Sequence, residues 1–321
     1  MKVLVTGGAG YIGSVLVNKL IEAGHQVNVL DDLSNGFQEN IDKNANFING
    51  SILEDNKLNQ ALDGVEIVMH LAAKIKVEEG QSQPDLYKKV NIEGTLNLLK
   101  MCSEKKINKF VFASTAAVYG DPEDFPLNEK SKVAPVNVYG ETKLAIDKYL
   151  EKNAQPLGIS SICFRFFNIG GALKTKAGNW LKIKHEGATH LIPSILHSST
   201  EKPFLIFGND WPTKDGTPTR DFLHVVDLVD ALIKSLDKLD KPGNQVINLG
   251  TATGSTVLEV IKTAELALGR SITYKFASRR AGDSFASVTN NEKAKEVLDW
   301  NPNISLVDIL IDAQSEFKSN N

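Results

Sequence analysis

The sequence predicts a doubly wound α/β fold, in which a parallel sheet is covered by helices on both faces and is followed by a smaller lobe. Three observations support this class. Short apolar runs alternate with helical stretches through the first half of the chain. A glycine-rich turn stands between the first run and the first helical stretch, and beyond about residue 169 the alternation loosens into turn-rich segments. A sheet of this kind places its ligands at the carboxyl ends of its strands.

The elements follow in order from the first residues. Lys2–Thr6 is an apolar run with no room for a helix before the glycines, so we expect a buried strand. A helix at 12–23 and a strand at 27–31 then complete a βαβ unit, which requires parallel strands. The alternation continues with expected strands at 47–49, 67–70, 110–114 and 159–165, and with expected helices at 54–61, 85–102 and 137–151.

The chain has 321 residues, which is enough for roughly two domains. We expect residues 1–168 to form the sheet domain and residues 169–321 to form a smaller, interleaved α/β lobe. The apolar run at 246–249 is typical of one more core strand. We therefore expect the chain to return from the smaller lobe to the sheet domain in a segment near 220–250. Residues 318–321 are polar and are expected to fray.

Composition and charge exclude several classes of partner. The formal net charge of -3 gives no basic surface for nucleic acid or for an anionic membrane. No uncharged apolar run approaches the roughly 18 residues that span a bilayer, and the chain begins directly with a strand, so the expected location is the cytoplasm. Cys102 and Cys163 lack metal-ligand spacing; we expect no disulfide and no metal site, and we expect both thiols to be buried.

The turn after the first strand carries Gly7, Gly10 and Gly13, between a predicted strand and a predicted helix. Without side chains the backbone can turn tightly and approach a pyrophosphate, whose charge the free N–H groups of the helix start attract. Such a turn can also exist without a ligand, but Asp31 ends the second strand, where a carboxylate can accept both ribose hydroxyls and would repel a 2′-phosphate. The pattern predicts NAD, rather than NADP, in a Rossmann domain.

Tyr139 and Lys143 are four residues apart on the helix expected after Asn137, so their side chains lie on one face. A tyrosine has an ordinary pKa of about 10, and a fixed cation nearby favours the phenolate and lowers that pKa. The tyrosine could then act as acid and base in turn. The alternative is that both side chains merely occupy an exposed helix face.

These motifs together resemble the extended short-chain dehydrogenase/reductase family, and distal motifs resemble its UDP-glucose 4-epimerase (UDP-galactose 4-epimerase) branch. The shared motifs stand at 7–14, 30–36, 70–73, 91–95, 114–120 and at Tyr139 and Lys143, and the more discriminating ones at 165–168, 190–193, 206–217, 220–225 and 279–283. The resemblance covers nearly the whole chain. It implies interconversion of UDP-glucose and UDP-galactose through a 4-keto intermediate with tightly bound NAD.

The resemblance also implies roles for individual residues. Tyr139 would be the catalytic base, and Lys143 would lower its pKa and bond the nicotinamide ribose. Thr115 would supply the active-site hydroxyl, with Ser114 as the alternative, although either could simply cap the next turn. Contacts to NAD are expected from Gly7, Gly10, Tyr11, Ile12, Gly13, Asp31, Asn35, Ser51, Ile52, Leu71, Ala72, Ala73, Asn91, Lys143 and Phe166.

The UDP-hexose would be held by a second group of residues. Arg220 and Arg280 are expected on the two phosphates, because a guanidinium fork matches phosphate oxygens in pairs. Phe207 is expected against uracil and Asp283 on the uridine ribose. The whole expected set is Thr115, Tyr139, Asn168, Leu191, Phe207, Arg220, Arg280, Asp283 and Ser287. Relatives commonly form homodimers through two helices, here expected at 85–102 and 140–151.

Three positions depart from the family pattern. Ser51 stands where an aspartate usually bonds adenine, and Phe166 replaces a tyrosine. Ser287 stands where relatives that handle only glucose and galactose nucleotides tend to carry a bulky tyrosine. A serine leaves room for an acetamido group, so UDP-GlcNAc and UDP-GalNAc are expected as further substrates.

The same residues argue against three other activities. A nucleotide-sugar dehydratase is expected to carry acidic residues beside the catalytic threonine, but Ala116 and Ala117 follow Thr115. A reductase would consume NADPH, which Asp31 disfavours. A regulatory NAD-binding protein without catalysis is disfavoured by an intact set of threonine, tyrosine and lysine.

Overall fold

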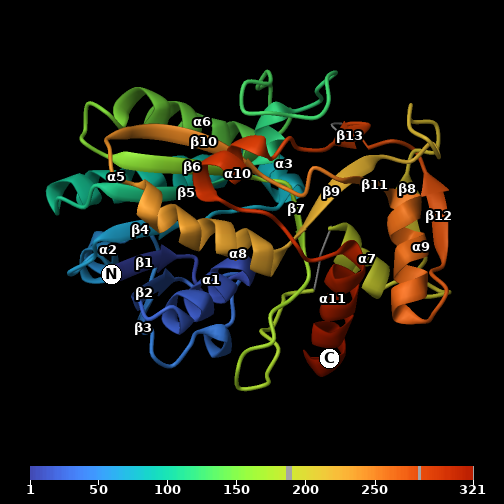
Figure 1. Cartoon of the computed structure of the whole chain (residues 1–321), viewed down its shortest axis with the longest axis horizontal. Helices are drawn as coiled ribbons and strands as arrows, with labels where there is room; N and C mark the ends of the chain where they lie inside the picture. The colour runs from blue at the N-terminus through green and yellow to red at the C-terminus, as the bar shows by residue number, and fades with distance from the viewer. Residues whose placement is uncertain (186–189, 281–282, 321) are drawn as a thin grey trace.

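The computed structural model describes residues 1–185, 190–280 and 283–320 and has the expected α/β architecture (Figure 1). Within these ranges the central sheet has seven strands in the order β10-β6-β5-β4-β1-β2-β3, and every neighbouring pair is parallel. The strands are β1 (Lys2–Thr6), β2 (Gln26–Asp31), β3 (Asn46–Asn49), β4 (Ile67–His70), β5 (Lys109–Thr115), β6 (Ser160–Phe166) and β10 (Gly243–Leu249).

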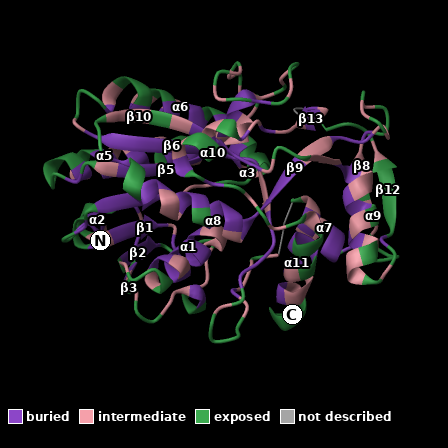
Figure 2. Cartoon of the chain, in the orientation of Figure 1, coloured by how far each residue is buried: buried purple, intermediate pink, exposed green. Residues whose placement is uncertain are grey.

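Helices cover both faces of this sheet because its strands are apolar on both sides. Val3 and Val5 point into one core with α1 (Tyr11–Glu22), α8 (Val225–Lys234) and α10 (Glu292–Leu298). Leu4 points to the opposite core, which contains α2 (Asp55–Ala61), α5 (Thr95–Glu104) and α6 (Val138–Asn153). Figure 2 shows the strands buried between these two helical layers.

The strand order reverses at β1, which has β2 on one side and β4 on the other. The helix that follows β1 and the helices that follow β4 therefore lie on opposite faces of the sheet. A crevice opens where such connections part, and in doubly wound sheets it is the usual ligand site. The fold thus directs attention to the carboxyl ends of β1 and β4.

The helix expected at 85–102 is interrupted. The chain instead forms α3 (Val77–Ser82), α4 (Pro84–Tyr87), a π-helical segment at Lys88–Gly94 and then α5. The wider π turn carries Asn91, whose side chain is buried. Hydrophobic spacing predicts a helix but does not register the extra residue that a π turn inserts, and such turns often occur at functional sites.

In the part of the chain that the structure describes, the smaller lobe consists of short strands and three helices with their own apolar core. Strand β9 pairs with β7, β11 and β13, and β8 pairs with β12. The predicted core strand at 246–249 is present as part of β10, beside β6, between β9 and β11 in sequence. The lobe elements are β7 (Asn168–Gly170), α7 (Leu191–Leu196), β8 (Phe204–Phe207), β9 (Thr219–His224), β11 (Gly254–Thr256), α9 (Val257–Leu268), β12 (Tyr274–Ala277), β13 (Ala286–Ser287) and α11 (Leu306–Asn320).

The prediction that the chain frays from residue 318 is wrong for residues 318–320, which continue α11, and residue 321 lies outside the described residues. Asn320 donates a side-chain hydrogen bond to Glu316, which holds the last turn. Cys102 and Cys163 are buried, as expected. In the described ranges no helix has the length and apolar character needed to cross a bilayer, and no group of acidic, histidine and cysteine side chains could hold a metal ion.

Candidate active site

A cavity of about 210 Å³ lies at the carboxyl ends of β1 and β4, where the strand order reverses. Fourteen of the fifteen residues expected to contact NAD line this cavity. The exception is Asn91, which is not among its described lining residues. The fourteen are Gly7, Gly10, Tyr11, Ile12, Gly13, Asp31, Asn35, Ser51, Ile52, Leu71, Ala72, Ala73, Lys143 and Phe166.

The glycine turn forms one wall of this cavity, and two of its positions exclude any side chain. Gly7 has a positive φ of 72°, and a Cβ atom there would lie 2.7 Å from the backbone nitrogen of Ala72. A Cβ atom on Gly13 would lie 2.0 Å from the carbonyl oxygen of Gly7. Within the described residues, no side chain accepts a hydrogen bond from the start of α1. The first N–H groups of this helix are therefore available to an anion.

Asp31 lies at the end of β2 and is oriented by the glycine turn. Its Oδ2 accepts a hydrogen bond from Ala9 N at 2.9 Å, and its Oδ1 accepts one from Leu33 N at 2.8 Å. Burial raises the pKa of this carboxyl, while the two backbone hydrogen bonds oppose that rise. Each oxygen keeps a further lone pair, so the carboxylate can still accept hydrogen bonds from ribose hydroxyls.

Two residues that were expected to contact NAD make hydrogen bonds within the protein. Asn91 bonds the backbone of Lys74 in both directions, at 2.8 Å and 2.9 Å, and also donates to Thr142 at 3.0 Å. Asn91 thereby shapes the segment after β4, whose Lys74 lines the cavity. Ser51 lines the cavity, and its hydroxyl accepts a hydrogen bond from Leu53 N at 3.3 Å.

Helix α6 delivers the tyrosine and the lysine to the same cavity. Asn137 starts the helix by accepting a hydrogen bond from Gly140 N at 2.8 Å. Tyr139 follows in the first turn, and Lys143 lies one turn later on the same face. The ammonium of Lys143 donates to the carbonyl oxygen of Ala113 at 2.7 Å and lies 6.0 Å from the centre of the Tyr139 ring.

The expectation that Lys143 lowers the pKa of Tyr139 is wrong for this arrangement. Burial raises the pKa of Tyr139 to about 12, and the influence that opposes this rise is a hydrogen bond with the side chain of Thr115. Burial also lowers the pKa of Lys143, to about 8. Because the ammonium is directed to the carbonyl of Ala113, it stabilises the phenolate less than the spacing of the two residues suggested.

Thr115 caps the next turn, which is one of its two expected roles, and its hydroxyl lies beside Tyr139. Its hydroxyl interacts with Tyr139, and it also accepts a hydrogen bond from Ala117 N at 3.1 Å, which caps the 3₁₀ turn at Ala116–Tyr119. Ser114 lines the cavity, whereas Thr115 is not among its described lining residues.

A buried ion pair beneath Lys143 was not recognised from the sequence. Asp147 lies one turn after Lys143 on α6 and accepts a hydrogen bond from Arg165 Nε at 3.0 Å. Arg165 also donates to the phenol oxygen of Tyr119 at 3.0 Å. Asp147 opposes the lowering of the Lys143 pKa. The four-residue spacing of Lys143 and Asp147 was a usable signal that this carboxylate lies near the ammonium of Lys143.

A second cavity, of about 1070 Å³, is lined by residues of the smaller lobe and of neighbouring loops. It brings together six of the nine expected substrate residues, while Tyr139 lines the smaller cavity and Thr115 and Ser287 line neither among the described residues. Ser287 in β13 is paired with Arg220 in β9. The six are Asn168, Leu191, Phe207, Arg220, Arg280 and Asp283.

Two guanidinium groups provide positive charge in the larger cavity. The guanidinium of Arg280 lies 3.9 Å from the centre of the Phe207 ring, so it covers one face of the ring that was expected to pack on uracil. Arg220 donates to the carbonyl oxygen of Thr219 at 2.9 Å. Burial lowers the pKa of Arg220, and the carboxylate of Asp283 opposes that shift. Both side chains line a cavity large enough for a nucleotide.

Part of the wall of the larger cavity had no signal in the sequence. Residues 171–185, here called the strap, follow β7 in the chain, and the strap residues Lys182, Ile183, Lys184 and His185 line the cavity. This segment has neither helical nor strand periodicity, and it contains none of the sequence motifs that predict a site. Its contribution depends on contacts with distant parts of the chain.

Comparison with known proteins gives a consistent result. The model of the NAD dependent epimerase/dehydratase family matches residues 3–250. The UDP-glucose 4-epimerase of Rhizobium meliloti is 39% identical over 319 residues, which cover 96% of this chain and 94% of that protein.

Two solved structures are similar over almost their full length. The UDP-glucose 4-epimerase of Stenotrophomonas maltophila, with bound NAD and formylated UDP-arabinopyranose, has a TM-score of 0.93 at 30% identity and covers 99% of this chain and 98% of that one. The UDP-Glc/GlcNAc 4-epimerase of Campylobacter jejuni has a TM-score of 0.85 at 31% identity and covers 99% of both chains.

Proposed function

The chain belongs to the NAD-dependent epimerase/dehydratase family, and from that membership we propose that it interconverts UDP-glucose and UDP-galactose with Tyr139 as the base. It is an enzyme with NAD as its cofactor. The observation that carries the proposal is that Tyr139 and Lys143 line the same cavity as the glycine turn and Asp31.

The residues of this chain divide the work of such a reaction. The start of α1 and Asp31 suit the pyrophosphate and ribose of NAD, which when bound supplies the hydride acceptor and donor. Tyr139 would take the proton from the sugar 4′-hydroxyl and return it after the 4-keto sugar has turned over. Because burial raises the pKa of Tyr139 to about 12, the phenol holds its proton at neutral pH, so the phenolate that accepts the sugar proton would have to be favoured by the positive charges of bound NAD and of Lys143. Arg220 and Arg280 would hold the diphosphate.

The proposal is tested by incubating the purified protein with UDP-galactose, with and without added NAD, and separating the two epimers. Appearance of UDP-glucose in either sample supports it. Absence of conversion in both samples contradicts it, and a 4-keto-6-deoxy product would indicate a dehydratase instead.

The alkaline side of the pH profile is expected to depend on Asp147. Its carboxylate opposes the lowering of the Lys143 pKa, which burial brings to about 8. In Asp147→Asn that opposition is gone, the pKa falls further, and the ammonium is lost at a lower pH. Turnover in the variant should therefore decline at a lower pH than in the wild type. Rates measured from about pH 6 to about pH 10 check this.

The matched control for that experiment is Asp230→Asn, which removes an exposed carboxylate from α8. It should leave the pH profile unchanged. Because Asp147→Asn also removes the buried carboxylate that pairs with Arg165, the folded fraction is measured at each pH. An unchanged alkaline limb in folded Asp147→Asn would rule out this role.

We also propose that UDP-GlcNAc and UDP-GalNAc are substrates, because Ser287 is small. Its pairing with Arg220, which lines the larger cavity, supports a place near the substrate, and a structurally similar Campylobacter jejuni protein is named a UDP-Glc/GlcNAc 4-epimerase. The variant Ser287→Tyr should lose turnover of UDP-GalNAc by roughly tenfold or more, since the added ring takes the space of the acetamido group. Turnover of UDP-galactose should change little.

Rates with both nucleotide sugars, in the wild type, in Ser287→Tyr and in Ser287→Ala as the control, decide this prediction. The alanine variant should retain both activities. If the wild type does not turn over UDP-GalNAc, the substrate prediction is wrong; if Ser287→Tyr slows both sugars equally, the serine does not select between them.

We further propose that the protein is a homodimer that pairs through α5 and α6. Beside their buried sides these helices carry partly buried apolar residues that a partner could cover, namely Leu96 and Met101 on α5 and Tyr149 on α6. Light scattering on the purified protein measures its mass and tests this.

A further inference from the structure

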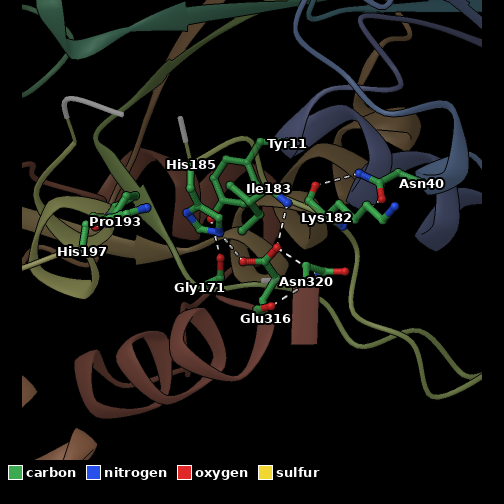
Figure 3. Close-up of polar contacts among 10 residues, drawn as sticks. All are labelled: Tyr11, Asn40, Gly171, Lys182, Ile183, His185, Pro193, His197, Glu316 and Asn320. Carbon is green, nitrogen blue, oxygen red and sulfur yellow. Dashed lines mark hydrogen bonds and ion pairs between the residues drawn. The ribbon is translucent and has the colours of Figure 1, made fainter. Parts of the chain in front are cut away.

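Glu316 is a fully buried carboxylate near the end of α11, beyond the segment 3–250 that the family model matches. It contacts the strap at two points (Figure 3). Its Oε1 accepts a hydrogen bond from Ile183 N at 2.8 Å, and its Oε2 lies 2.6 Å from His185 Nε2. Among the described residues His185 is its only ion-pair partner. A buried carboxylate is costly unless such partners satisfy it, so the three groups hold one another in place.

The other side of the strap is held by the sheet domain. Asn40 donates to the carbonyl oxygen of Lys182 and accepts from Lys182 N, both at 2.8 Å (Figure 3). The carbonyl oxygen of Asn40 in turn accepts a hydrogen bond from Asn18 of α1 at 3.1 Å. Two neighbouring strap residues are therefore hydrogen-bonded to different parts of the protein. Lys182 is linked through Asn40 to α1, and Ile183 is bonded to α11.

The same cluster lies between the two cavities. Lys182, Ile183 and His185 line the larger one, and Tyr11 lines the smaller one. Tyr11 donates to the carbonyl oxygen of Gly171, where the strap begins, at 2.7 Å. Its phenol is also close enough to Glu316 for that charge to add to the effect of burial in raising the Tyr11 pKa. The position of the strap is therefore set by residues from both domains.

We propose that Glu316 is a positioning residue for substrate binding, which holds strap residues 182–185 as a wall of the larger cavity. The inference rests on the proposed function in that the ligand of this cavity is taken to be a uridine nucleotide. Glu316 does not line the cavity and has no chemical role in the reaction. Its removal leaves the Ile183 N–H and the His185 ring without their acceptor, and the wall loses the contact that orders it.

The simpler role for Glu316 would be to dock α11 onto the rest of the protein, and the same helix provides a control for it. Asp312, one turn earlier, places Oδ2 3.3 Å from His224 Nε2. His224 lies at the junction of β9 and α8, and neither residue lines the larger cavity. Asp312→Asn therefore weakens an acid–histidine contact of α11 without removing an acceptor from the strap.

The experiment uses the full-length enzyme in four forms: wild type, Glu316→Ala, Glu316→Gln and Asp312→Asn. Calorimetry measures the Kd for UDP, steady-state rates give kcat and KM for UDP-galactose, and the NAD content and melting temperature of each protein are recorded. Glu316→Ala should raise both the Kd for UDP and the KM by about tenfold, with kcat within about twofold and NAD content unchanged. Glu316→Gln, which keeps an acceptor for Ile183, should lose less. Asp312→Asn should lower the melting temperature without changing the Kd.

The inference is overturned if Glu316→Ala binds UDP as tightly as Asp312→Asn does, or if kcat falls while KM stays constant. If Glu316→Ala does not fold, Asn40→Ala takes its place, because it removes the two hydrogen bonds that hold Lys182 from the other side of the strap. This variant should also raise the Kd for UDP. An unchanged Kd in Asn40→Ala likewise overturns the inference. Binding of UDP is measured without turnover. A wild type that binds UDP but forms no epimer contradicts the proposed function and leaves this inference testable by the same Kd values.

Discussion

Replacing Tyr139 with phenylalanine is expected to reduce epimerase turnover by about a thousandfold or more while NAD remains bound. The change removes one hydroxyl from a side chain that lines the NAD cavity and interacts with Thr115. General acid–base catalysis by a positioned group contributes roughly 10² to 10⁴ in rate, and the proposed mechanism would use the phenol twice, once to accept the proton and once to return it. Turnover of UDP-galactose and the NAD content of the purified variant provide the measurement.

Tyr149→Phe is the matched control for that prediction. It makes the same change ten residues later on the same helix, at a half-buried position packed against the core that α6 shares with α2 and α5. We expect turnover close to that of the wild type. A Tyr139→Phe enzyme with substantial activity would exclude Tyr139 as the base and would shift attention to Thr115.

Replacing Gly13 with alanine is expected to abolish NAD binding and, with it, turnover. The new Cβ atom would lie 2.0 Å from the carbonyl oxygen of Gly7. The backbone fixes the position of a Cβ atom and the oxygen is itself a backbone atom, so no side-chain rotation relieves the clash. Overpacking of a tight core commonly costs about 1–3 kcal/mol, and a backbone clash belongs at or beyond the upper end of that range. The bound NAD per protein, the melting temperature and the rate test this together.

Gly10→Ala gives a graded comparison within the same turn. Its Cβ atom would lie 3.3 Å from the same carbonyl oxygen, a distance that a shift of a few tenths of an ångström can relieve. The variant should therefore keep part of its NAD. A Gly13→Ala protein with wild-type NAD content would show that the turn can open without loss of the cofactor.

The sequence predicted the fold class, and most of the residues that it assigned to NAD line one cavity, because the signals for both are local. The strand, glycine turn, helix and strand up to Asp31 lie within about 30 residues, and each was recognised from spacing alone. Expected strands at the centre of the sheet are present, and the further strand that ends at Leu249 lies beside β6. The same locality explains the error at 85–102, since a π turn changes the backbone without changing the hydrophobic pattern.

The sequence alone determined the family and the residue types expected in the active site, because each motif is a short stretch of residues that can be recognised without the structure. Electrostatics and the walls of the cavities were decided only by the tertiary structure. The spacing of Tyr139 and Lys143 predicted a lowered tyrosine pKa, yet burial raises it to about 12, and burial depends on the whole fold. Ile183 and Glu316 meet across 133 residues, so no local pattern records their contact.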